Sequence, residues 1–168
     1  VTAINIYVSQ ANGKTAYWHG SVAVGTTTYA ILATTSTARE AKNRFMTAPP
    51  AGNLLSSRNG RIYIASGNAL HWTEPLGYGL YDPMKNYVLL DSNIMVMGCV
   101  TDGVWVVTQE YVYFLSGANP NEASLDPKAD YSAPMQQVVH LPDSNDIAWL
   151  SHRGWVIGTT NGQLKNIG

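Results

Sequence analysis

Short runs of alternating apolar and polar residues recur along the chain, and one pattern occurs three times. Each copy begins with a polar residue and a glycine, enters a run rich in β-branched and aromatic residues, and adds a second such run after a polar turn. The copies span residues 59–72, 102–115 and 153–167. A period of two residues is typical of strands, and polar glycine turns join strands into hairpins. The pattern therefore predicts an all-β fold built from hairpins.

The first 33 residues predict a small β meander. Asn12-Gly13 supplies the positive φ angles that a tight hairpin turn needs. The strands are expected at residues 4–8, 15–19, 21–24 and 26–32. A sheet of this size is not stable alone, so the meander at 1–33 must pack on something else.

Residues 34–52 carry no strand pattern and predict an extended connector. Pro49 and Pro50 follow each other near its end, and proline ends regular elements because it lacks a backbone N–H. The boundary between the N-terminal meander and the rest of the chain is therefore expected in this connector.

Residues 53–168 hold the three repeats at intervals of about 40 to 50 residues, a period typical of β-propeller blades with four strands each. A blade is covered on both faces, which suits the apolar run at 104–107. About two and a half blades fit, too few to close a ring, so a partial propeller is predicted and a β-sandwich is the alternative. An irregular loop is expected at 117–134. Strands of the last two units are expected at 86–90, 94–100, 103–108, 111–115, 136–141, 146–151, 154–159 and 163–167.

Charge changes this picture by excluding some partners. Charged residues make up 12% of the chain and the net charge is −1, with no basic run. Specific nucleic-acid binding is therefore not expected, because it needs a positive surface. Polar residues break the longest apolar stretches, so no membrane insertion is expected either. Low charge with many polar turns suits extracellular and virion β proteins.

Cofactor and metal sites are not indicated. Cys99 is the only cysteine, which excludes an internal disulfide and a cysteine-based zinc cluster, and its apolar surroundings predict a buried, inert thiol. The chain has four histidines, and none of them has the spacing of a helical metal site. They are His19, His71, His140 and His152. We therefore predict no cofactor and no metal.

Catalytic motifs are also missing from the sequence. It has no nucleophile elbow, phosphate-binding loop or dinucleotide fingerprint. A propeller glycosidase would need a carboxylate pair, but the acidic residues lie mostly at turns, where they bind local backbone groups. These candidates are Glu74, Asp82, Asp91, Asp102, Glu110, Glu122, Asp126, Asp130, Asp143 and Asp146. We therefore predict a protein that is not an enzyme and has no catalytic residues.

Aromatic residues supply the candidate interface. Trp72, Trp105, Trp149 and Trp155 are expected in the core between sheets. Tyr78 and Tyr81, with Asp82 and Pro83, lie instead in a stretch rich in glycine, and loop aromatics often anchor interfaces. These four loop residues are the interface candidates.

Several motifs together resemble a known group of proteins. The first group of motifs comprises residues 59–68, Leu70-His71-Trp72-Thr73-Glu74-Pro75 and residues 79–83. The second group comprises residues 102–108 and 114–120. The third group, at the end of the sequence, comprises residues 149–154, Gly158 and residues 161–166. In this combination the chain resembles uncharacterised virion structural proteins of tailed bacteriophages and prophages, similar in style to propeller-shaped nozzle proteins. The resemblance covers 53–168 well and 1–33 loosely, as a fibronectin-like lead-in.

The resemblance implies a role in assembly. It implies a virion structural protein of the neck or tail that is made in the host cytoplasm. The protein would be a rigid β scaffold whose loops 74–85 and 117–135 contact neighbouring virion subunits. A homo-oligomer is expected. It carries over no active-site residue. Family members are longer and this chain begins with Val1, so we expect a processed or excised piece. The alternative is a carbohydrate-binding or adhesin-like propeller module that recognises a surface glycan.

Overall fold

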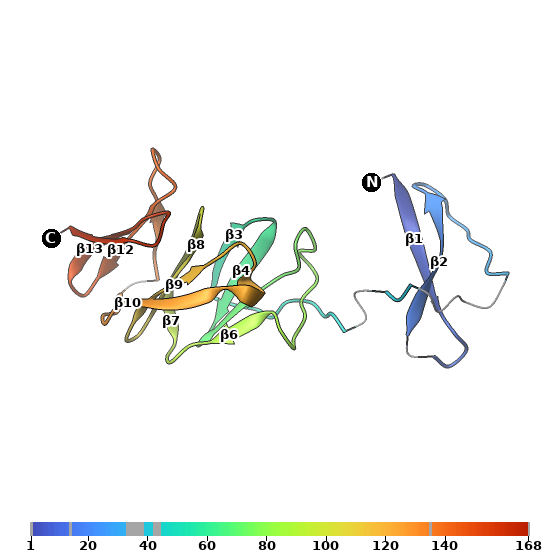
Figure 1. The fold of residues 1–168 in the computed structure, drawn as a ribbon, viewed down its shortest axis with the longest axis horizontal. Helices are drawn as coiled ribbons and strands as arrows, with labels where there is room; N and C mark the ends of the chain where they lie inside the picture. The colour runs from blue at the N-terminus through green and yellow to red at the C-terminus, as the bar shows by residue number, and fades with distance from the viewer. Residues whose placement is uncertain (1, 14, 33–38, 42–44, 135, 168) are drawn as a thin grey trace. The chain divides into compact units, whose positions relative to one another are not determined.

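The computed structural model describes residues 2–13, 15–32, 39–41, 45–134 and 136–167. It divides the chain into two compact units, Val1–Met46 and Thr47–Gly168. Both consist of antiparallel sheets, so the all-β prediction is confirmed (Figure 1). Among the described residues, no helix has the length and apolar character needed to span a bilayer.

The N-terminal unit is a hairpin of β1 (Ala3–Ser9) and β2 (Ala16–Ala23). Its connection turns through Asn12, whose φ is 59°. The second strand pair predicted at 21–24 and 26–32 is wrong, because β2 continues to Ala23 and 26–32 has no regular structure. Tyr29 of that segment instead packs by its side chain, with its hydroxyl 2.6 Å from His19 Nδ1.

Part of the predicted connector joins this hairpin. The backbone N–H of Trp18 donates to the Arg39 carbonyl, and that of Ala41 donates to the Ala16 carbonyl. An isolated bridge between Tyr17 and Glu40 completes the pairing, so residues 39–41 extend the sheet alongside β2. Residues 33–38 and 42–44, which belong to the predicted meander end and connector, lie outside the described residues.

The larger unit contains three four-stranded meanders. The first sheet consists of β3 (Leu54–Arg58), β4 (Arg61–Ser66), β5 (Ala69–Trp72) and β6 (Tyr87–Leu89). The second sheet consists of β7 (Ile94–Val100), β8 (Gly103–Thr108), β9 (Val112–Ser116) and β10 (Ser124–Ala129), with a short 3₁₀ helix η1 (Pro120–Glu122) before β10. The third sheet consists of β11 (Val139–His140), β12 (Ile147–Ser151), β13 (Gly154–Gly158) and β14 (Leu164–Ile167).

Two assignments to sheets differ from the prediction. The strand expected at 86–90 pairs with β5 in the first sheet, not with the second. The second sheet is completed by β10, which lies inside the loop predicted at 117–134. Pro127 obscured this strand in the sequence, yet β10 is an edge strand and its register shifts between Pro127 and Ala129, which is where a sheet tolerates a residue without an N–H.

Each of the three repeats begins at a tight hairpin turn, and in the first repeat the turn is the Asn-Gly pair itself. Arg58 pairs with Arg61 across a two-residue connection, and Asn59 and Gly60 there have φ angles of 50° and 69°. Both angles are positive, as in the tight turns that match strand twist. Two-residue connections also join β7 to β8, where Val100 pairs with Gly103, and β12 to β13, where Ser151 pairs with Gly154, but in these two the glycine begins the second strand instead of lying in the turn.

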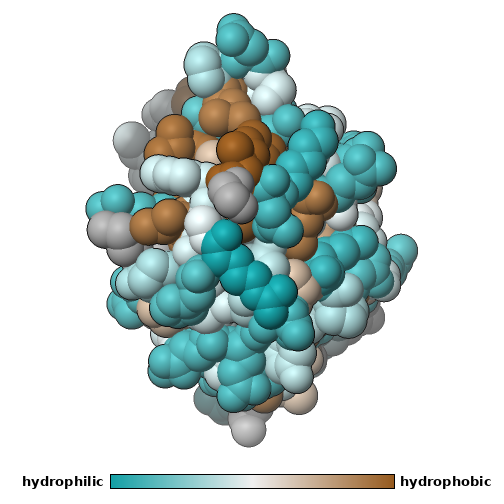
Figure 2. Space-filling model, turned by 90° about the vertical axis from the view of Figure 1, so that its left-hand side faces the viewer, coloured by the Kyte–Doolittle hydropathy of each residue, from teal (hydrophilic) through white to brown (hydrophobic). Residues whose placement is uncertain are grey.

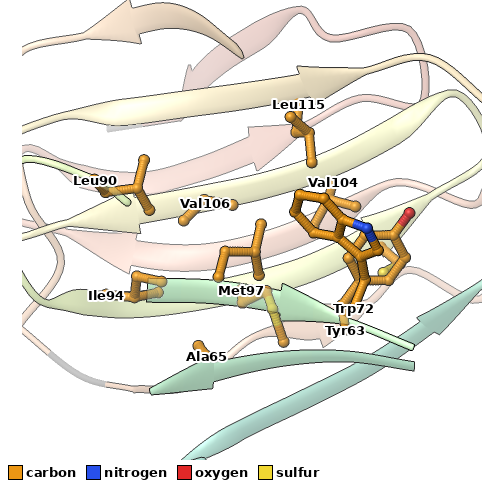
Figure 3. Packing of buried hydrophobic residues seen from close by; sticks show 11 residues of the cluster. Tyr63, Ala65, Trp72, Leu90, Ile94, Met97, Val104, Val106 and Leu115 are labelled. Carbon is orange, nitrogen blue, oxygen red and sulfur yellow. The ribbon is translucent and has the colours of Figure 1, made fainter. Parts of the chain in front are cut away.

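One core fills the space between the first and second sheets. Figure 3 shows the side chains of Tyr63, Trp72, Met97 and Val106 directed into this space. The buried set also includes Ala65, Leu70, Leu90, Ile94, Cys99, Val104 and Leu115. Arg58 links the two sheets at the edge of this core, since its guanidinium donates to the carbonyls of Thr101 (2.9 Å) and Gly117 (2.7 Å).

A second core lies between the second and third sheets. Trp105 is at its centre, with ring centroids 4.8 Å from Phe114 and 5.9 Å from Trp149. The other buried members are Val96, Val100, Val107, Val112, Tyr131, Ala133, Ile147 and Val156. All six residues of β8 are buried because alternate side chains enter the two cores. This confirms that the run at 104–107 is covered on both faces.

The tryptophan prediction is confirmed for three residues and wrong for one. Trp72, Trp105 and Trp149 are buried. Trp155 is 55% exposed, because it points away from the second core on β13, beside the buried Val156. The third sheet is therefore covered on one face only by the described chain. Ring closure, and with it the propeller arrangement, stays a prediction.

Cys99 lies in the first core as expected, and its thiol is predicted to be unreactive in the folded protein. Burial raises the pKa of the thiol to about 11, although a hydrogen bond with Ser56 and the charge of Arg58 oppose the shift. A thiol reagent at pH 8 should therefore label Cys99 only in denaturant, because the thiolate is the reactive form. Rapid stoichiometric labelling in native buffer would contradict the burial.

The same shift predicts a loss of stability in alkali. The folded pKa of about 11 lies above the ordinary value of 9.0, so the unfolded thiol loses its proton first. The free energy of unfolding should then fall as pH rises from about 9 to about 11. Cys99→Ala provides the control in urea titrations, because the part of this decline that is due to the thiol should be absent in that variant.

Candidate interaction site

The loop between β5 and β6, residues 74–86, is held to the first sheet along its length. Backbone hydrogen bonds join Glu74 N to Leu80 O (2.9 Å), Leu80 N to Gly77 O (2.8 Å) and Leu76 N to Gly60 O (2.7 Å). At its end, the buried Asn86 donates from its side chain to Glu74 Oε1 at 2.8 Å. The loop is thus a compact structure that is closed on itself and fixed to the β3–β4 turn.

Tyr81 anchors this loop from inside. It is only 7% exposed, and its hydroxyl lies 2.9 Å from His71 Nδ1, with the two rings edge to face. Its backbone exchanges two hydrogen bonds of 2.8 Å with Thr47. Burial raises the pKa of Tyr81 and lowers that of His71, so both side chains stay neutral near pH 7.

Asp82 fixes the turn that follows. Its carboxylate accepts a hydrogen bond from Met84 N at 3.0 Å and lies 3.5 Å from Lys85 Nζ. Its carbonyl accepts from Asn86 N at 2.9 Å. This is the local backbone capping that aspartate commonly provides in turns. Pro83, between these partners, is exposed.

The outer surface of the loop carries large apolar side chains. Leu76 is 81% exposed and Met84 is 83% exposed, and Tyr78 is also more than half exposed. Leu76 has a φ of 57°, a conformation that costs free energy for a branched side chain. Of the four predicted interface residues, Tyr78 and Pro83 lie on this surface, whereas Tyr81 and Asp82 support it from within. Sequence reasoning missed Leu76 and Met84, although apolar residues in a glycine-rich loop were a visible signal.

A second candidate is a polar cleft of about 470 Å³. It is formed by the β8–β9 turn, the residues after β10 and the β12–β13 turn, so it brings together three segments that are distant in sequence. Its lining residues are Gln109, Glu110, Tyr111, Asp130, Tyr131, Ser132, His152 and Arg153. No sequence pattern grouped these residues, because β10 was not expected and its position brings Asp130 to the cleft.

Charges in the cleft are partly paired. Arg153 lies 3.3 Å from Asp130 Oδ1, and its guanidinium is 5.2 Å from the centre of the Tyr131 ring. The Tyr131 hydroxyl donates to Asn166 Oδ1 at 2.9 Å, and burial raises the pKa of Tyr131. Glu110 and Tyr111 also line the cleft. The cleft thus offers carboxylate acceptors, guanidinium donors and aromatic surface to a polar molecule.

Three other acidic side chains accept hydrogen bonds from polar groups of the chain. Asp146 accepts from Thr160 N at 2.8 Å, Asp126 from Ser124 Oγ at 2.7 Å, and Glu122 from Asn119 Nδ2 at 2.9 Å. Of these three, only Glu122 lies in a turn beside its partner, because Asp126 lies within β10 and the partner of Asp146 is 14 residues away, so the local capping expected of these carboxylates stays a prediction.

Neither a metal site nor a known family adds to this description. No group of three or more histidine, cysteine, aspartate and glutamate side chains is placed to hold a metal ion within the described part of the chain. The loop at 74–86 and the polar cleft both present exposed groups that could meet a partner. In comparisons with known proteins, no family model and no curated protein sequence matches this chain.

Proposed function

We propose that this chain is a non-enzymatic structural protein of a phage particle, in the neck or tail, where it contacts neighbouring subunits. The observation that carries the proposal is the loop at 74–86, which is fixed on its inner side and presents Leu76 and Met84 almost fully to solvent. A strained, exposed leucine costs free energy in the isolated chain, and burial against a neighbour would offset that cost. The resemblance of residues 53–168 to virion proteins supports the same role.

In this proposal the three sheets act as successive blades of a propeller-like scaffold. Two cores fix their relative positions, and a rigid scaffold keeps the loop in the conformation that a neighbour would recognise. Low conformational freedom before binding favours assembly, because less entropy is lost on contact. The blades of one chain do not complete a ring, so neighbouring virion subunits would complete it.

The virion role is tested on particles. Mass spectrometry of purified phage particles from a culture that encodes the chain should detect it as a component. Particles that lack the chain, while it accumulates in the cell lysate, would overturn the proposal.

The loop contact makes a sharper prediction. Leu76→Ser combined with Met84→Ser should lower incorporation into particles by about tenfold or more, since a loss of about 1.4 kcal/mol of binding is tenfold in affinity. Quantitative mass spectrometry of particles assembled with each variant measures this. Leu32→Ser is the matched control, because Leu32 is also almost fully exposed but lies in the N-terminal unit. Equal incorporation of both variants would exclude the loop as a contact.

The polar cleft favours a second function, binding of a surface glycan. Aromatic rings beside carboxylate and guanidinium groups suit sugar rings, which have both apolar faces and hydroxyl groups. A glycan array should then show specific binding that is lost in Tyr111→Ala and Arg153→Ala but retained in Tyr78→Ala, whose ring lies outside the cleft. The absence of specific binding on the array would remove this alternative.

A further inference from the structure

A second, smaller cavity adjoins the polar cleft. It has a volume of about 150 Å³, and its lining comes from the first sheet, the start of β7 and the nearby loops. Four carboxamide side chains belong to this lining, so we name the cavity the amide pocket: Asn53, Asn93, Gln109 and Gln136. Among the described residues that line it, none is charged. The amide pocket therefore differs in chemistry from the polar cleft, which has both acidic and basic side chains.

Gln109 lines both cavities, which places them side by side at the turn between β8 and β9. From this turn the amide pocket extends to Gly67 in the β4–β5 turn, and the polar cleft extends to Arg153 in the β12–β13 turn. Hydrogen bonds hold these segments together, because Ile94 N donates to the Gly67 carbonyl at 2.9 Å and Ser132 Oγ donates to the Thr108 carbonyl at 2.9 Å. The two cavities thus form a groove across one end of all three sheets.

The side chains of the amide pocket are free to bind a ligand. All four amides are exposed, and no hydrogen bond joins their side chains to another residue in the described part of the chain. Each amide has two N–H donors and a carbonyl acceptor, and none of these groups titrates. The half-buried side chains of Leu54 and Met95 lie in the same lining. Such a pocket suits an uncharged unit that has several hydroxyl groups and an apolar face.

The polar cleft supplies the aromatic surface of the groove. Tyr111 is 39% exposed, and the centre of its ring lies 6.0 Å from that of Tyr113, two residues along the same segment. The ring of Tyr131 is buried instead, with the Arg153 guanidinium over it. Tyr111 is therefore the ring on which a sugar face could pack.

Size indicates how the two cavities would share a ligand. Pockets for small molecules usually have about 300 to 1,000 Å³. The polar cleft, at about 470 Å³, lies within this range, whereas the amide pocket lies below it. The amide pocket is thus suited to one unit of a ligand whose other units lie in the polar cleft.

The position of the groove favours a saccharide over a peptide. Extended peptides commonly bind along an exposed strand edge, but this groove is lined by turns and strand ends. Figure 2 looks onto the side of the molecule where the third sheet lies, and polar residues cover most of the surface seen there. A polar surface of this kind suits a ligand rich in hydroxyl groups.

We infer that the groove binds an oligosaccharide, with an uncharged sugar unit in the amide pocket and the adjoining units in the polar cleft, against Tyr111. The inference rests on the glycan-binding function proposed above. It adds a second subsite, the need for a chain of sugars instead of a single one, and the uncharged character of the unit at one end.

The test measures how binding depends on the length of the saccharide. The probe is a glycan array that carries neutral and acidic saccharides, each as a series from the single sugar to the hexasaccharide. The unchanged full chain should bind at least one series with an affinity that rises with length, because longer members fill both cavities. Asn93→Ala combined with Gln136→Ala should lower the affinity for the longest member about tenfold, through the loss of two hydrogen-bonding groups. The shortest bound member should bind this double variant normally, since it lies in the polar cleft.

Matched variants separate the two subsites. Gln137→Ala should bind every member normally, because Gln137 is an exposed glutamine beside Gln136 but lies outside the lining of the amide pocket. Tyr111→Ala should lower the affinity for every member, because it removes the aromatic surface of the polar cleft. These side chains are all exposed, so circular dichroism should show the same β spectrum for each variant.

Equal affinity for short and long members, or an unchanged affinity in the double variant, would overturn the inference. If Tyr111→Ala still lost binding, the glycan-binding function would stand with the polar cleft as its only subsite. Absence of binding to every saccharide would defeat both the inference and that function. A parallel peptide array tests the competing class of ligand, and peptide binding that Tyr111→Ala abolishes, without saccharide binding, would assign the groove to a protein partner.

Discussion

Replacing Trp105 with alanine is expected to lower the free energy of unfolding by about 3 to 5 kcal/mol. The side chain is completely buried between Phe114 and Trp149. Its Nε1 donates to the Thr159 carbonyl at 3.0 Å, so the truncation removes this hydrogen bond and leaves a cavity, although the carbonyl still accepts from Gly162 N at 3.2 Å. Urea unfolding followed by circular dichroism measures the loss, which would remove much of the stability of a domain of ordinary size.

Two further variants resolve the causes of this loss. Trp155→Ala removes the same atoms from an exposed position and should change stability by no more than about 0.5 kcal/mol when measured on dilute monomer. Trp105→Phe keeps an aromatic ring but removes the N–H, so the difference between Trp105→Phe and Trp105→Ala separates the packing contribution from the hydrogen bond. Equal stability losses for Trp105→Ala and Trp155→Ala would show that the second core does not have the packing described.

Hairpins were predictable because their signals are local. Asn59-Gly60 defines a turn by the φ angles that those two residues adopt readily, and the apolar run of β8 indicates burial on both faces without knowledge of its neighbours. Such features depend on a few consecutive residues, so the sequence alone is enough to place them.

The grouping of strands into sheets depends on contacts that are distant in sequence. Residues 87–89 satisfied the strand pattern equally well as the start of the second sheet or the end of the first, and the pairing of β6 with β5 decides between them. The strand β10 contains Pro127 and follows a 3₁₀ turn, so its local pattern indicated a loop. Only its position at the sheet edge makes the proline acceptable.

The candidate site was predictable in place but not in detail. Glycine and tyrosine content identified the stretch that includes Tyr78 and Tyr81, yet the two rings have opposite environments. The position of Tyr81 depends on Thr47 and His71, which are 34 and 10 residues away in sequence and meet it only in the folded unit. Trp155 illustrates the same point. Side chains alternate along β13, so the sequence predicts that Trp155 and Val156 lie on opposite faces of the sheet, but it does not predict which face is covered.

Gly103→Ala is expected to destabilise the fold by about 2 to 3 kcal/mol, near the upper end of the range for overpacking a core. An added Cβ would lie 2.5 Å from the Leu115 carbonyl oxygen and against the ring of Phe114. The backbone oxygen cannot move away easily, because Val104 pairs with Leu115 in the adjacent rung of the β8–β9 ladder. The expected cost therefore comes from close approach of two strands, which explains why a glycine begins β8.

Gly79→Ala is the matched control for this prediction. A Cβ at Gly79 would meet no atom within 4 Å, and alanine reduces the entropy of the unfolded chain, so its stability should be unchanged or slightly higher. Urea unfolding of both variants gives the comparison directly. If Gly103→Ala were as stable as Gly79→Ala, β8 and β9 would have to lie further apart than described, and Trp105, which β8 carries into the second core, would be placed wrongly as well.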